Sequence, residues 1–110
     1  MAPVTTLLVL TNLPDRSVAE ALAQDLVAQR LAACVNILSA CRSVYRWQGT
    51  IETSDEVPLL IKTTSERYPA LQAAILARHP YELPEVIAWP IAHGLPGYLA
   101  WVADEVAQGD

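Results

Sequence analysis

The chain has 110 residues, 53% of them apolar and 17% charged, and carries a formal net charge of −5. This length fits a single domain, residues 1–110, with a substantial core. The acidic balance and the absence of a basic run in the sequence argue against nucleic-acid partners, which need clustered lysine and arginine. No apolar stretch approaches the roughly 20 residues that span a bilayer, so we expect no membrane partner. Met1-Ala2-Pro3-Val4 lacks the basic start of a signal peptide, which favours a cytoplasmic location.

The first two elements are predicted to be a strand and a helix. The apolar, β-branched run from residue 4 to 10 is typical of a strand buried on both faces. After a break at residues 12–15, Val18, Leu22 and Leu26, with Ala21 beside them, recur at helical spacing. This helix begins either with a capping box at residues 17–20 or with Asp15 as its N-cap.

A hairpin with long arms is predicted next. Residues 33–47 contain no glycine or proline and are rich in β-branched and aromatic residues, Gln48-Gly49 forms a turn, and a second arm covers residues 50–64. We expect this second arm to be interrupted around Ser54-Asp55, with Asp55 and Glu56 as a solvated break.

The remaining pattern completes an α+β domain. Ser65 is expected to cap a second helix, residues 86–89 form a strand that Pro90 closes, and Gly94-Leu95-Pro96-Gly97 leads into a short C-terminal helix. The order βαββαβ plus a terminal helix predicts a ferredoxin-like fold, an antiparallel sheet with both helices on one face.

The length of the hairpin also predicts assembly. A strand of about 14 residues is about 46 Å long, whereas a domain of this size has a radius of gyration near 13 Å. The overhanging arms would expose apolar side chains and unpaired backbone, and another copy of the chain is their natural cover. We therefore expect a homo-oligomer.

The segment His79-Pro80-Tyr81-Glu82-Leu83-Pro84-Glu85 combines an imidazole, a phenol and two carboxylates. One imidazole with carboxylates suits Zn²⁺ or Cu²⁺. However, in a proline-held polyproline II segment residues three apart are separated by about 9 Å, so one ion cannot easily reach all of these groups. The alternative is a loop at a subunit interface, and the two interpretations can hold together.

Five motifs in order make the chain closely resemble the CutA family, the divalent-cation tolerance proteins. They are Leu31–Ile37, Tyr45–Gly49, Leu60–Thr64, His79–Glu85 and Tyr98–Trp101, and together they run through most of the chain. The resemblance implies a ferredoxin-like homotrimer whose long hairpins pair between subunits, with a shape similar to the PII signalling proteins. It also implies a non-enzymatic role in tolerance to copper and other divalent cations.

The resemblance implies His79 as the metal ligand. Some members that are thought to bind copper carry a cysteine where this chain has Thr11 and a second histidine where it has Arg78. Of that ligand set only His79 is present. A divalent ion, Cu²⁺ or Zn²⁺, is the expected cofactor.

A second functional hypothesis is a small-ligand sensor with clefts between subunits. Its predicted lining is Cys34, Trp47, Lys62, Tyr81, Glu82 and Glu85. Each also has a structural interpretation: Trp47, like Tyr45, can pack against a neighbouring subunit, Lys62 can be an outward residue of its strand, and Cys34, like Cys41, can be a small buried thiol. A purely structural or partner-binding trimer is the third hypothesis.

Enzymatic activity is not expected. The sequence offers no recognisable arrangement of nucleophile, base and orienting group. Arg46 and Asn36 are the nominal counterparts of the phosphate-holding residues in ferredoxin-like acylphosphatases, but no glycine-rich phosphate loop precedes a helix.

Overall fold

The computed structural model describes residues 4–108, so the expectation about a signal peptide at Met1-Ala2-Pro3 lies outside the described part of the chain. Five strands and three helices follow one another in a ferredoxin-like order. They are β1 (Thr6–Leu13), α1 (Arg16–Ala28), β2 (Cys34–Ile37), β3 (Cys41–Trp47), β4 (Thr50–Thr64), α2 (Tyr68–Arg78), β5 (Val86–Pro90) and α3 (Pro96–Glu105).

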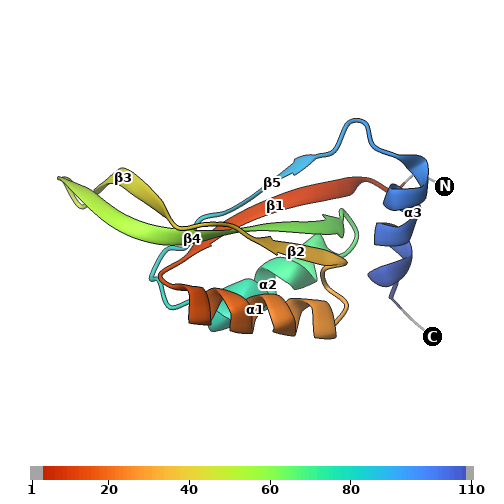
Figure 1. Ribbon diagram of the computed structural model, residues 1–110, viewed down its shortest axis with the longest axis horizontal. Coiled ribbons are helices and arrows are strands. Elements are labelled where there is room, and N and C mark those ends of the chain that lie inside the picture. Colours follow the sequence, from red (N-terminus) through yellow and green to blue (C-terminus); the bar gives the residue numbers. More distant parts are fainter. Residues whose placement is uncertain (1–3, 109–110) are drawn as a thin grey trace.

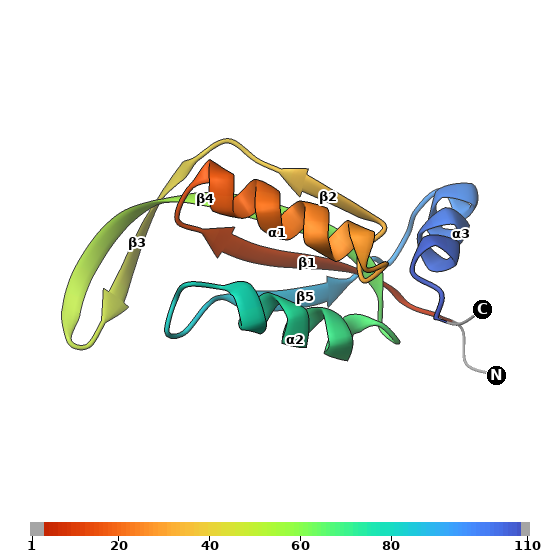
Figure 2. The same ribbon diagram turned by 90° about the horizontal axis from the view of Figure 1, so that it is seen from below.

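The sheet is antiparallel throughout. Its strand order is β2-β4-β1-β5, and β3 pairs with the other half of β4. Helices α1 and α2 lie side by side on one face, and α3 lies at the end of the sheet away from the hairpin (Figures 1 and 2). The predicted α+β, ferredoxin-like arrangement is confirmed.

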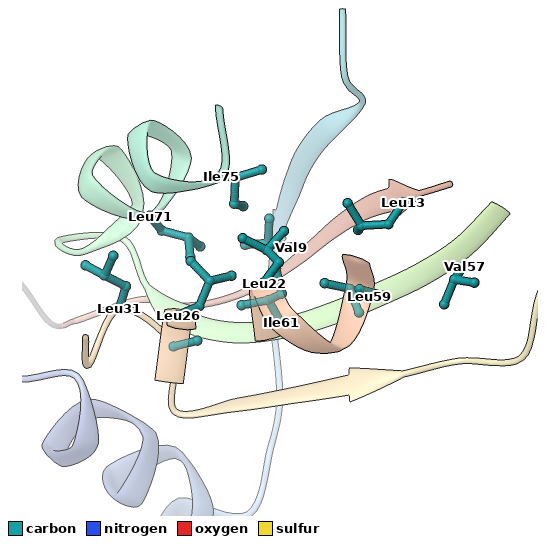
Figure 3. Close-up of a cluster of buried hydrophobic side chains, with 12 residues drawn as sticks. Val9, Leu13, Leu22, Leu26, Leu31, Val57, Leu59, Ile61, Leu71 and Ile75 are labelled. Atoms are coloured by element: carbon teal, nitrogen blue, oxygen red, sulfur yellow. The ribbon is translucent and has the colours of Figure 1, made fainter. Parts of the chain in front are cut away.

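The core lies between this sheet and the two covering helices (Figure 3). Alternate residues of β1 and β4, among them Val9, Leu59 and Ile61, are fully buried against Leu22 and Leu26 of α1 and against residues of α2. Ala21 does not join them, contrary to expectation. It is exposed, and its neighbours at positions 19 and 23 are buried instead.

The opposite face of the sheet carries no helix, so β1 is not buried on both faces as expected. Cross-strand register places two rows of side chains on this open face, because directly opposed residues of antiparallel strands point the same way. The rows are Cys34-Lys62-Leu8-Trp89 and Asn36-Leu60-Leu10-Ile87. The ends of both rows on β5 are apolar and exposed, 42% for Trp89 and 47% for Ile87.

A bulge separates β2 from β3. Ile37 faces Leu59 and Cys41 faces Glu56, so three residues (38–40) stand opposite two (57–58). Pro58 lacks an N–H and cannot donate to the ladder here, although its carbonyl accepts a hydrogen bond of 3.0 Å from the N–H of Leu38. The break therefore lies in the first arm, and the expected interruption of the second arm at Ser54-Asp55 is wrong, since β4 runs unbroken through it.

Beyond the bulge, β3 and the first half of β4 project from the body (Figure 1). The molecule measures 47 × 26 × 23 Å with a radius of gyration of 14.8 Å, above the roughly 13 Å of a compact domain of this length. The hairpin ends at Gln48 and Gly49, whose φ angles of 49° and 85° form the predicted turn. Apolar side chains on these arms are exposed, 67% for Val44 and 70% for Ile51.

The helix starts distinguish between the predicted caps. Asp15 is the N-cap of α1, and its carboxylate accepts a hydrogen bond of 2.9 Å from the N–H of Val18. Ser65 does not cap α2. It lies in a turn closed by the N–H of Arg67 on the carbonyl of Thr64, and α2 begins just before Pro69, which suits a first turn. Among residues 4–108, no helix is both long and apolar enough to cross a bilayer.

Arg30 ties the end of α1 to the end of α3. It follows the helix in the left-handed region, φ 60°, a position that usually holds glycine. Its guanidinium donates hydrogen bonds of 2.9 and 3.0 Å to the carbonyls of Glu105 and Asp104. These carbonyls end α3 without partners inside the helix, so a cationic donor satisfies them well.

The Arg30 contact predicts an unusual order of stabilities. Arg30→Ala removes both hydrogen bonds yet keeps a Cβ in the left-handed region, and should lower the free energy of unfolding by about 1–3 kcal/mol. Arg30→Gly loses the same bonds but relieves the backbone, and should be more stable than Arg30→Ala by about 1 kcal/mol. Urea denaturation of the two variants measures the difference. An alanine variant at least as stable as the glycine variant would contradict this account.

Candidate functional site

A groove lies where the projecting hairpin meets the loop between α2 and β5. Its volume is about 760 Å³, within the range of small-ligand sites. One wall is made by β3 and the outer half of β4, and the other by the loop at residues 81–85 and the end of β1. The bulge positions the first wall, because it is where the hairpin leaves the plane of the sheet.

The lining of this groove is aromatic and acidic. The aromatic members are Tyr45, Trp47 and Tyr81, and the acidic members are Asp55, Glu56, Glu82 and Glu85. Within the part of the chain that the structure describes, no lysine or arginine lines it. One carboxylate already has a cation at its side, since Asp55 forms an exposed ion pair of 3.3 Å with Arg42.

Glu56 was expected in a solvated break but is 9% exposed. It faces Tyr81 across the groove. Burial, followed by the interaction with the Glu56 carboxylate, raises the pKa of the Tyr81 phenol to about 12. Tyr81 therefore stays protonated at physiological pH and presents its hydroxyl to a carboxylate.

Two further hydrogen bonds fix the walls. The hydroxyls of Tyr45 on β3 and Ser54 on β4 lie 2.7 Å apart, which holds the aromatic ring against its own hairpin. Asn12, at the end of β1, donates a hydrogen bond of 3.0 Å to Glu85. The groove thus has supported side chains on both sides.

His79 lies under the loop and is 8% exposed. Its Nε2 donates to the carbonyl of Asn12 at 2.8 Å, and its Nδ1 accepts from the N–H of Tyr81 at 3.3 Å. The two partners require the neutral tautomer with hydrogen on Nε2. Burial lowers the pKa of His79, although the Asn12 carbonyl and the Glu56 carboxylate oppose this shift.

This arrangement leaves His79 without a free lone pair for a metal. Binding through Nδ1 would break the hydrogen bond from Tyr81, and binding through Nε2 would displace a proton. Across residues 4–108, no group of three or more histidine, cysteine, aspartate or glutamate side chains is arranged to hold a metal ion. A dedicated chelating site within one copy of the chain therefore does not fit the residues described.

A second cluster lies on the open face of the sheet. The ammonium of Lys62 is 3.8 Å from the sulfur of Cys34 and also donates to the side-chain oxygen of Asn36. Tyr98 of α3 joins them, and burial together with Cys34 raises the pKa of its phenol. The two cysteines are free and lie on different strands, Cys34 half-buried and Cys41 exposed.

The six predicted lining residues are thus divided between two places. Trp47, Tyr81, Glu82 and Glu85 come together in the groove. Cys34 and Lys62 do not join them in one copy, because six residues of β4, about 20 Å, separate Glu56 from Lys62. Lys62 is not the groove's cation.

The sequence reasoning missed Glu56 and Asn12 as lining residues. Glu56 directly precedes the buried apolar run Val57–Ile61, and that neighbourhood is the signal that could have suggested a buried carboxylate. Asn12 gave no such signal, since it follows a strand as many turn residues do.

The comparisons with known proteins agree with one another. The family model of the CutA1 divalent ion tolerance protein matches residues 7–105. The divalent-cation tolerance protein CutA of Thermus thermophilus is 46% identical over 96 residues, which cover 87% of this chain and 93% of that protein. Its solved structure superposes with a TM-score of 0.91, covering 93% of this chain and 99% of that one.

More distant relatives share the same domain. Protein CutA of Mus musculus is 47% identical over 81% of this chain, which spans only 50% of the mouse protein. A solved CutA from Archaeoglobus fulgidus, described as a periplasmic divalent cation tolerance protein, has a TM-score of 0.89 at 34% identity and covers 92% of this chain and 98% of that one.

His79 predicts a pH dependence of stability. Because its folded pKa lies below the unfolded value of about 6.5, the unfolded chain binds the proton more readily. The contribution of neutral His79 is complete above pH 6.5 and is lost as the pH falls below it. Thermal melts at pH 7.5 and pH 5 should show a smaller acid loss in His79→Gln than in the wild type. His93→Gln, at an exposed position, is the control. An unchanged acid loss in His79→Gln would refute this role.

Proposed function

Because the chain belongs to the CutA1 family of divalent ion tolerance proteins, we propose that it acts in divalent-cation tolerance as a non-enzymatic homotrimer that binds Cu²⁺ or Zn²⁺ weakly. The observation that carries this proposal is the groove, where the carboxylates of Glu56, Glu82 and Glu85 meet and no basic side chain of residues 4–108 contributes to the lining. Carboxylates suit hard and borderline divalent ions.

The binding is weak in this proposal because the histidine is already engaged. His79 must give up its hydrogen bond with Tyr81 or with Asn12 before a metal can reach its ring. The opening of the loop at residues 79–81 would offset part of the binding free energy. Tolerance then comes from reversible uptake of ions rather than from a tight store.

Assembly is supported by apolar surface in two places. The open face of the sheet exposes Ile87 and Trp89, and the hairpin exposes Val44 and Ile51. A sheet face and overhanging arms of this kind are usually covered by another chain. The number three follows from the family resemblance.

A cytoplasmic location is part of the proposal. The two cysteines are free thiols, as is usual in a reducing compartment. The Archaeoglobus fulgidus relative, in contrast, is described as periplasmic.

A second candidate function is the binding of a small organic ligand. The volume of about 760 Å³ favours it, since this is far more space than one ion needs. In a homotrimer, Cys34 and Lys62 of a neighbouring copy could complete the lining, which would reunite the six predicted residues. Ion binding and ligand binding can belong to the same protein.

Calorimetric titration tests the metal proposal. Cu²⁺ and Zn²⁺ should give measurable heat with the wild-type protein and less heat with His79→Ala, since the ring nitrogen is lost. His93→Ala removes the other histidine, which is exposed, and should behave like the wild type. Identical isotherms for all three proteins, or no heat at all, would refute binding at His79.

Sedimentation equilibrium tests the assembly. The wild type should sediment as a trimer, and Ile51→Lys and Trp89→Lys should weaken association because each puts a charge into a covered apolar surface. Leu76→Lys is the control, because Leu76 is 50% exposed on α2, away from both surfaces. A monomeric wild type at all concentrations would overturn the proposal.

A further inference from the structure

We infer that the groove between the hairpin and the loop at residues 81–85 binds an organic cation, an ammonium or guanidinium group carried on a carbon chain. The inference rests on the second candidate function and assigns a chemical class to its ligand. It depends on the charges, the aromatic walls and the volume of the groove.

The charge of the lining is unbalanced. Glu56 is nine-tenths buried, and within the described residues no cationic group forms an ion pair with it. Glu82 and Glu85 stand opposite on the loop. A buried carboxylate is costly without a positive partner, so a ligand that brings a positive charge gains most at Glu56.

The nearest cations of the chain do not supply this partner. Arg42 is paired with Asp55 at the exposed edge of the hairpin. Arg46 lies between Tyr45 and Trp47 on β3, and alternation along a strand turns it to the opposite side. Lys62 belongs to the separate cluster with Cys34 and Asn36.

The aromatic walls favour a cation with an apolar body. Tyr45, Trp47 and Tyr81 offer ring faces, and ammonium and guanidinium groups are attracted to such faces. The hydroxyl of Tyr45 is already bonded to Ser54, and that of Tyr81 faces Glu56. The exposed parts of these residues are therefore chiefly their rings, which suit methylene groups.

Other ligand classes fit less well. An anion such as a nucleotide would meet the carboxylates of Glu56, Glu82 and Glu85 without a basic residue to hold its phosphates. A compact metal ion would leave most of the 760 Å³ and all three aromatic residues unused. An uncharged apolar molecule would bury the carboxylates without compensation.

The test is calorimetric titration with diaminooctane, a chain with an ammonium at each end, against octanediol, which has the same length and no charge. The wild type should bind diaminooctane at least tenfold more tightly than octanediol, and the affinity should fall as salt rises. Glu56→Gln should weaken diamine binding about tenfold and Glu82→Gln severalfold. Glu20→Gln, an exposed position on α1 outside the groove, should leave it unchanged.

The outcomes separate this inference from the proposed function. Melting temperature and sedimentation of each variant show whether it folds and assembles, and the exposed Glu82→Gln keeps the test valid if Glu56→Gln does not fold. Binding of ATP in place of the diamine would retain a ligand-binding function and overturn the organic cation. No binding of either would overturn both. Octanediol binding as tightly as the diamine would refute the role of charge. A change of oligomeric state in Glu56→Gln without diamine binding would assign the groove to a basic side chain of another copy.

Discussion

The whole arrangement depends on one constraint, the long strand β4, which is shared by three partner strands. Its inner half pairs with β1 and β2 and contributes Leu59 and Ile61 to the core, while its outer half pairs only with β3. The bulge opposite Val57-Pro58 divides the two halves without breaking β4. The strand can therefore be a core element at one end and a wall of the groove at the other.

This division separates stability from recognition. The inner half carries a continuous apolar core, and the outer half carries exposed apolar and aromatic side chains with little beneath them. Substitutions on the hairpin should thus affect assembly and ligands more than the folding of one copy. Glu56 is the exception, because it lies at the boundary and is both buried and part of the lining.

Most of the fold could be predicted from the sequence, because apolar periodicity and turn residues determine it locally. The strands, the Gln48-Gly49 turn and the ferredoxin-like order follow from such patterns. The position of the hairpin break could not, since it depends on Pro58 facing a residue in another strand. The site was predicted in part: the loop at residues 81–85 came from its own composition, but the burial of Glu56 and the engagement of His79 with Asn12 require contacts between distant segments.

The contacts around the groove also have a consequence for the order of folding. Asn12 and Glu85, which brace one side, are 73 residues apart in the chain. Contacts of such high sequence separation form late, because a long loop must close first. The hairpin can pair locally beforehand, but the second wall exists only after β5 has docked beside β1. A ligand of this groove would consequently recognise only chains that have completed folding, and a chain still emerging from synthesis, with β5 not yet made, would not compete for it.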